Sequence, residues 1–85
     1  MYRNRERLIS VCPLNFVEIG KTIEVYEIHG GIALRRRLAH MGIYPGVRMK
    51  VLLNKGIGSV MVAINEKRIG FGFGMCNKII VRVLD

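Results

Sequence analysis

One stretch decides how this chain folds, and it reads IALRRRLAHMGIYPGV at residues 32–47. Its first ten residues predict the one helix of the chain, because Leu34, Leu38 and Met41 recur at i, i+4 and i+7 and share a face. Gly42 follows directly, at the place where helices commonly end on a left-handed glycine. The stretch therefore predicts a short amphipathic helix that ends at Met41.

The end of this stretch predicts a tight turn. In Tyr44-Pro45-Gly46-Val47, proline and glycine occupy the two central positions that a type II turn favours for them. Such a turn requires a positive φ at Gly46, as a left-handed helix end does at Gly42. We therefore assign Gly42, Pro45 and Gly46 as structural turn residues and expect a positive φ at both glycines.

Strands are expected on both sides of this unit. After it, alternation predicts strands at Val47–Leu53, Ser59–Ile64 and Arg68–Phe73, and Ile79–Leu84 has the composition of a closing strand. In Arg68–Phe73 the apolar residues, Phe73 included, alternate with glycines. This pattern suits a strongly coiled strand or the close approach of another backbone.

The N-terminal half predicts two further strands. Residues 8–11 have strand composition, and Cys12-Pro13-Leu14 ends this strand or begins a loop. Thr22–Ile28 alternates as far as Val25 and then slips by one residue, which is typical of a β-bulge or a sharp bend.

Together these elements predict a mainly β fold of five or six short strands with one short helix at about residues 32–41. A small, strongly curved sheet tends to close on itself, so we expect a small SH3-like barrel. At 85 residues the chain has room for one domain. We place that domain at residues 8–85, after a basic arm at residues 1–7.

The composition bounds the function. Fourteen Lys and Arg against six Asp and Glu give a net charge of +8, which would suit RNA, DNA or an anionic membrane surface. No apolar run approaches the roughly 18–20 residues of a membrane span. The charged start of the chain is followed by no small-residue cleavage site, so we expect a cytoplasmic protein.

The sequence offers no catalytic set. Ser10 and Ser59 lie in no nucleophile-elbow context, the only histidines are His29 and His40, and no pair of carboxylates stands out. We therefore expect no catalytic residues and no enzymatic activity.

Metal binding has little support. Four soft ligands are available, Cys12, Cys76, His29 and His40, but none is paired at the spacing that local metal sites use. Small buried hydrophobes are the simpler interpretation of the two cysteines. We expect no metal site and no required cofactor, with at most adventitious transition-metal binding at His40 or near His29.

The densest charge is Arg35-Arg36-Arg37. Successive helical residues are about 100° apart, which places Arg36 opposite the apolar face, with His40 one turn further on. Two interpretations stay open: a solvated helix surface, or a basic ridge that docks on an acidic partner through arginine's planar guanidinium. On the second, Arg35, Arg36 and His40 are the candidate partner-binding residues.

Gly31 followed by residues 34–47 resembles the helix-turn signature of FeoA-domain proteins, in which an arginine-leucine helix runs into a Leu/Met-Gly-hydrophobic-x-Pro-Gly turn. The order of the later strands is similar too, so the resemblance covers about residues 8–84. It implies an SH3-like barrel and a cytosolic accessory protein of ferrous iron uptake. It supplies no invariant catalytic or iron-ligand set.

The partner that the resemblance implies is FeoB, a membrane iron permease with a cytosolic GTP-binding domain, which this chain would bind and modulate. One alternative is a basic nucleic-acid-binding barrel, which the supply of only three tyrosines for base stacking disfavours. Another is a metal-dependent regulatory domain, because FeoA domains also occur in metal-dependent repressors. These 85 residues contain no helix-turn-helix segment.

Overall fold

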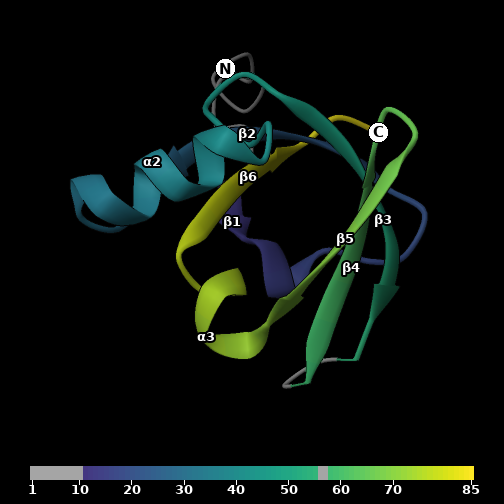
Figure 1. The fold of residues 1–85 in the computed structure, drawn as a ribbon. Coiled ribbons are helices and arrows are strands. Elements are labelled where there is room, and N and C mark those ends of the chain that lie inside the picture. The colour runs from purple at the N-terminus through teal and green to yellow at the C-terminus, as the bar shows by residue number, and fades with distance from the viewer. Residues whose placement is uncertain (1–10, 56–57) are drawn as a thin grey trace, which may run out of the picture.

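A computed structural model of the chain describes residues 11–55 and 58–85. The arm at residues 1–7 and the start of the first expected strand lie outside these ranges. Figure 1 shows the elements, which follow one another as β1 (Val11–Pro13), η1 (Leu14–Phe16), β2 (Thr22–Ile28), α2 (Ile32–His40), β3 (Arg48–Asn54), β4 (Ser59–Ile64), β5 (Lys67–Gly72), α3 (Phe73–Cys76) and β6 (Ile79–Val83).

The strands form one antiparallel sheet in the order β1-β6-β2-β3-β4-β5. The closing strand β6 lies between β1 and β2, so the two ends of the described chain meet in the sheet. Figure 1 shows the sheet curling round on itself, with α2 standing to one side. The architecture is therefore the small, mainly β, SH3-like barrel that the sequence predicts.

The slip predicted in β2 is present. The register between β2 and β6 shifts between Val25 and Glu27, as a β-bulge requires. The bulge takes up one residue, so Val25 and Ile28 are both buried while Tyr26 is exposed. The guanidinium of Arg82 lies 5.5 Å from the centre of the Tyr26 ring, within range of a cation–π contact.

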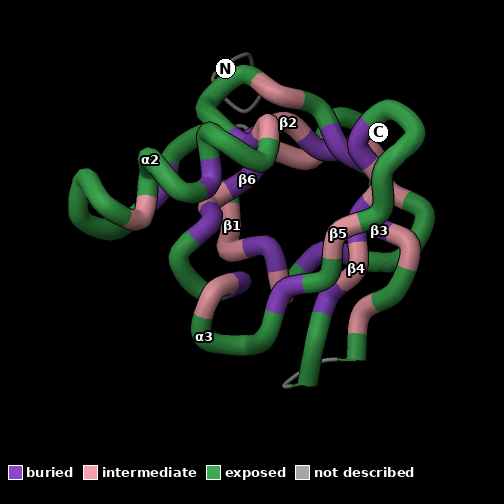
Figure 2. Tube along the Cα trace, viewed as in Figure 1, coloured by how far each residue is buried: buried purple, intermediate pink, exposed green. Residues whose placement is uncertain are grey.

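One apolar core fills the barrel, and Figure 2 marks its buried residues in purple along the strands. Alternation along β4 buries Val60, Val62 and Ile64 on one face, as predicted. No polar or charged residue of the described part is buried. Burial of aliphatic side chains, at roughly 25 cal/mol per Å² of apolar surface, is therefore the main force that stabilises this fold.

Helix α2 buries fewer of its apolar side chains against the barrel than its sequence predicts. Leu38 is buried and Leu34 half-buried, but Met41, the third residue of the apolar stripe, is exposed. The helix ends one residue early, at His40, and Met41 becomes its C-terminal cap. The backbone N–H of Ile43 then donates to the Leu38 carbonyl at 2.9 Å, which closes the end of the helix.

The expectation for Phe73 is wrong. The strand ends at Gly72, and residues 73–76 form the helical turn α3, which leaves the Phe73 side chain 43% exposed. Cys76, at the end of this turn, is buried as the sequence predicts, and its thiol donates to the Phe71 carbonyl at 3.5 Å. Alternation places side chains only while a strand lasts, so it does not apply to Phe73 once the chain changes to helical geometry.

Candidate functional site

The turn that follows α2 positions the candidate site. The φ angles of Gly42 and Gly46 are +88° and +100°, which confirms the left-handed conformation predicted for both. The Val47 N–H donates to the Tyr44 carbonyl at 3.1 Å across the turn, with Pro45 inside it. A Cβ at either glycine would meet no atom within 4 Å, so backbone conformation alone explains the choice of glycine.

Two hydrogen bonds fasten this turn to the sheet. The Gly46 N–H donates to the Val25 carbonyl, and the Val25 N–H donates to the Val47 carbonyl, each at 2.8 Å. Ile43, in the segment between the helix and the turn, is fully buried. The end of α2 is therefore held against β2, although most of the helix lies outside the core.

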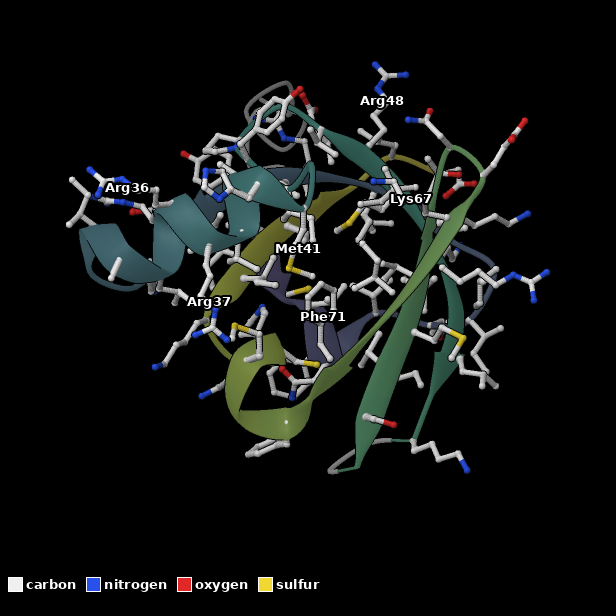
Figure 3. All side chains as sticks on the ribbon, viewed as in Figure 1. Arg36, Arg37, Met41, Arg48, Lys67 and Phe71 are labelled. Atoms are coloured by element: carbon white, nitrogen blue, oxygen red, sulfur yellow. The ribbon has the colours of Figure 1, made fainter. Side chains whose placement is uncertain are left out.

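The outer face of α2 carries the predicted partner-binding residues. Arg35, Arg36 and His40 are all exposed, and Arg36 and His40 are one helical turn apart. Figure 3 shows Arg36 pointing away from the body of the molecule. None of these side chains contacts a carboxylate within residues 11–55 and 58–85, where the one such contact joins His29 Nε2 and Glu27 Oε1 at 3.5 Å. The face therefore presents basic groups that are available to an acidic partner.

A groove on the inner side of α2 was missed by the sequence reasoning. One part, of about 190 Å³, lies between the C-terminal half of α2 and the strand β5 with α3. A second part, of about 320 Å³, lies between the glycine turn and the β4–β5 hairpin. Met41 lines both parts, so the two hollows are neighbours on the surface and together make up the groove. The lining residues are Arg37, Leu38, Met41, Gly42, Tyr44, Val47, Arg48, Ile64, Asn65, Lys67, Gly70, Phe71, Gly72 and Met75.

The groove has an apolar middle and basic ends. Figure 3 shows Met41 and Phe71 close to each other between α2 and β5, with Arg37 on one side and Arg48 and Lys67 on the other. No acidic side chain lines either part. The alternation of glycine along β5 was the signal that could have indicated this surface. Its other wall lies some thirty residues earlier in the sequence, beyond the reach of local patterns.

The two cysteines are not among the residues that form either surface. Cys12 is half-buried on β1, Cys76 is buried on α3, and neither forms a disulfide. Burial raises the pKa of both thiols above the ordinary value of 9.0. Among the described residues there is no group of three or more His, Cys, Asp and Glu side chains that could hold a metal ion. No helix of the described part is long and apolar enough to cross a membrane.

Both surfaces are suited to binding another molecule rather than to catalysing a reaction. They present guanidinium and ammonium groups, thioether and aromatic side chains and backbone groups, which suit binding to carboxylates and apolar residues.

Comparison with known proteins finds a matching family model and a similar curated sequence. A family model described as the FeoA domain matches residues 12–83. A curated protein of Methanocaldococcus jannaschii, named "Putative Fe(2+) transport protein A", is 35% identical over 69 residues. That match covers 81% of this chain and 83% of the relative.

Solved structures agree with this match. An iron uptake regulatory protein (FeoA) superposes with a TM-score of 0.80 at 31% identity, over 88% of this chain and 100% of its own. The FeoA protein from Chlorobium tepidum gives 0.74 at 27% identity, over 86% and 70%. A manganese-dependent transcriptional repressor gives 0.78 at 26% identity, over 89% of this chain but 43% of its own.

Proposed function

Because this chain belongs to the FeoA domain family, we propose that it is a small accessory protein of ferrous iron uptake that acts by binding a partner. The relative named for Fe(2+) transport supports a role in ferrous iron uptake. The observation that carries a binding role is the outer face of α2, where Arg35, Arg36 and His40 are exposed and make no ion pair within the described residues.

The proposed partner is the cytosolic GTP-binding domain of a FeoB-type membrane iron permease, which places this chain in the cytoplasm. Arginine suits such an interface because its planar guanidinium pairs with a carboxylate through two parallel hydrogen bonds. A net charge of +8 would steer the chain toward an acidic surface and speed association at low salt. In this role the chain modulates the permease without any chemical step of its own.

Metal is not part of the proposed mechanism. The proposal requires no cofactor, because guanidinium groups and backbone contacts are sufficient for recognition of an acidic surface. Weak binding of transition metals at His29 or His40, both exposed, would be adventitious.

The likeness to the manganese-dependent repressor does not lead to a second proposal. It extends over 43% of that chain, so it establishes a shared domain architecture and no more. No metal-ligand cluster is found in the described residues to suggest a metal-sensing role for this domain.

A pull-down with the immobilised GTP-binding domain of the permease tests the proposal. It is performed in Mg²⁺ without nucleotide, with GDP and with a non-hydrolysable GTP analogue, each with the chain as purified and with the chain treated with EDTA and desalted beforehand. We expect the chain to be retained in at least one nucleotide state, with retention that falls as salt rises and is unchanged by EDTA. Absence of retention in all states at low salt would overturn the proposed partner, and loss with EDTA would overturn the metal-independent mechanism.

A further inference from the structure

We propose that the free edge of β5 and the groove beside it bind an extended segment of a partner protein, with an apolar centre and acidic ends, as an added β-strand. This surface is distinct from the outer face of α2. The inference does not depend on the permease being the partner, so it stands or falls separately from the proposed function.

The edge of β5 is the first observation. In the strand order β5 lies at one end of the sheet and pairs with β4 alone. A two-residue turn joins them, with Asn65 at φ 55° in its first central position, so Ile64 and Lys67 form the hydrogen-bonded pair that closes the hairpin. Counting from this pair, the backbone groups of Arg68 and Gly70 face away from β4 and are open to another strand.

The glycines of β5 are the second observation. Gly70 and Gly72 do not have positive φ angles, and a Cβ at either would meet no atom within 4 Å. Glycine weakens a strand relative to alanine, and nothing among residues 11–55 and 58–85 requires it at these positions. Gly70 and Gly72 line the groove, so their missing side chains leave room there for the side chains and backbone of a ligand strand.

The groove specifies the chemistry of that strand. Its middle is apolar, with Met41 and Phe71 facing each other, and Phe71 is part of the core, so this wall is rigid. Its ends are basic, with Arg37 at one and Arg48 and Lys67 at the other. A strand of six residues is about 20 Å long, which allows roughly seven ligand residues to reach from one basic end to the other.

Charge selects among the possible occupants. The N-terminal arm of this chain carries Arg3, Arg5 and Arg7 against Glu6, so basic ends of the groove would repel it. A second copy pairing edge to edge would bring the same basic residues of two chains at +8 together. Nucleic acid offers no strand backbone to pair with β5. An acidic segment of another protein therefore fits best, by the mode in which peptides add to exposed sheet edges.

The binding test uses the full chain and a fluorescein-labelled peptide of sequence Asp-Glu-Val-Leu-Val-Glu-Asp. We expect saturable binding by fluorescence anisotropy that weakens as salt rises, and chemical-shift changes in the ¹⁵N-labelled chain centred on Arg68, Gly70 and Gly72. The same peptide with Lys in place of its acidic residues should not bind. Shift changes confined to α2 or β3, or equal binding of both peptides, would overturn the proposal.

Two N-methylated peptides test strand addition itself. Methylation of alternate peptide nitrogens blocks one edge of the ligand strand, and methylation of the other alternate set blocks the opposite edge, with the same side chains in both. One of the two should bind about tenfold or more weakly and the other nearly normally, because only one edge faces β5. Equal affinities for the two would show that no strand is added.

Charge-reversed variants test the ends of the groove. The change R37E with K67E should weaken peptide binding about tenfold or more, because it places like charges beside the acidic ends. The matched control K50E with K78E lowers the net charge equally at exposed positions outside the groove. If both variants lost the same peptide affinity, the loss would come from the lower net charge and not from the groove, and the proposal would be overturned.

Two further measurements control for misfolding of the variants and for self-association of the chain. Circular dichroism checks that each variant folds, and the N-methylated peptides decide the question on the unmodified chain should R37E with K67E fail to fold. Sedimentation of the chain alone should give a monomer or an assembly in which the amides of Arg68 and Gly70 still respond to peptide. A dimer that protects those amides and excludes the peptide would assign the edge to a second copy and overturn the proposed occupant.

Discussion

Gly42 and Gly46 show how single residues set the geometry of this molecule. Both have positive φ angles, and both have room for a larger side chain. Their role is therefore conformational, because an L-residue in this region is strained even where it fits. With Pro45 fixing the turn between them, these residues determine the angle at which α2 leaves the sheet.

The first prediction follows from these φ angles. Gly42→Ala and Gly46→Ala should each lower the free energy of unfolding by about 1 kcal/mol or more, measured by urea denaturation. Gly74→Ala is the matched control, because Gly74 lies in α3 without a positive φ and with no atom within 4 Å of a Cβ. That control should be neutral or slightly stabilising. An unchanged midpoint for both turn variants would contradict the argument.

The second prediction concerns the thiols. Burial raises the pKa of Cys12 and Cys76, so at pH 7–8 each holds a smaller fraction of reactive thiolate than a free cysteine. Reaction with a disulfide reagent should be slower than that of glutathione, slowest at the fully buried Cys76, and should accelerate as pH rises above 9. Rapid labelling of Cys76 at neutral pH in the folded chain would show that it is more accessible than the structure indicates.

A third prediction concerns metal at the same residues. Neither cysteine belongs to a ligand cluster in the described part of the chain. The double variant Cys12→Ser with Cys76→Ser, purified beside the parent, should therefore have the same metal content by elemental analysis. Loss of a stoichiometric metal from the variant would establish a site that needs both thiols.

At the scale of elements, helix α2 contributes little to the core and exposes most of its side chains. One side chain, Leu38, is fully buried, and even Ile32 is 62% exposed. The helix is held at its C-terminal end by the glycine turn, while its arginines face solvent or the groove. An element that contributes so little to the core can change its outer residues at small cost to stability.

The fourth prediction tests this outer face. Arg35→Glu with Arg36→Glu reverses two exposed charges, so the chain should fold normally by circular dichroism. Binding to an acidic partner should weaken by about 2 kcal/mol or more, because repulsion replaces attraction, and permease-dependent iron uptake should fall in cells. Lys50→Glu with Lys78→Glu, which changes the net charge equally elsewhere, should leave uptake near normal. Normal uptake with a folded Arg35/Arg36 variant would remove this face from the interface.

At the scale of the whole molecule, the single core makes the barrel one cooperative unit. Its buried residues come from every strand of the sheet except the short β1, and also from η1, α2 and α3. A chain of this size should therefore unfold in one transition. Far-ultraviolet circular dichroism and tyrosine fluorescence, followed together in urea, should give coincident curves.

The fifth prediction measures that core. Ile79→Ala removes a fully buried side chain from β6 and should cost about 2–5 kcal/mol. Ile19→Ala makes the same chemical change at an exposed position and should be nearly neutral. Equal effects at the two positions, or two separate transitions for the parent chain, would contradict a single cooperative core.

The sequence by itself determined the local structure. The period of the apolar residues predicted α2, the alternation predicted β4, and the slip after Val25 predicted the bulge of β2. The same holds for Gly42 and Gly46, whose φ angles follow from helix-end and turn chemistry. These features were predictable because steric preference and side-chain period act over a few residues.

Only the tertiary structure decided the surfaces. It showed that β5 is an edge strand, that Met41 belongs to a groove wall and that Phe73 leaves the strand for the helical turn α3 and is exposed. The outer face of α2 follows from helical period, but the groove requires residues 37–48 to meet residues 64–75. Which strand is left without a neighbour depends on how the whole sheet closes, and no local pattern contains that information.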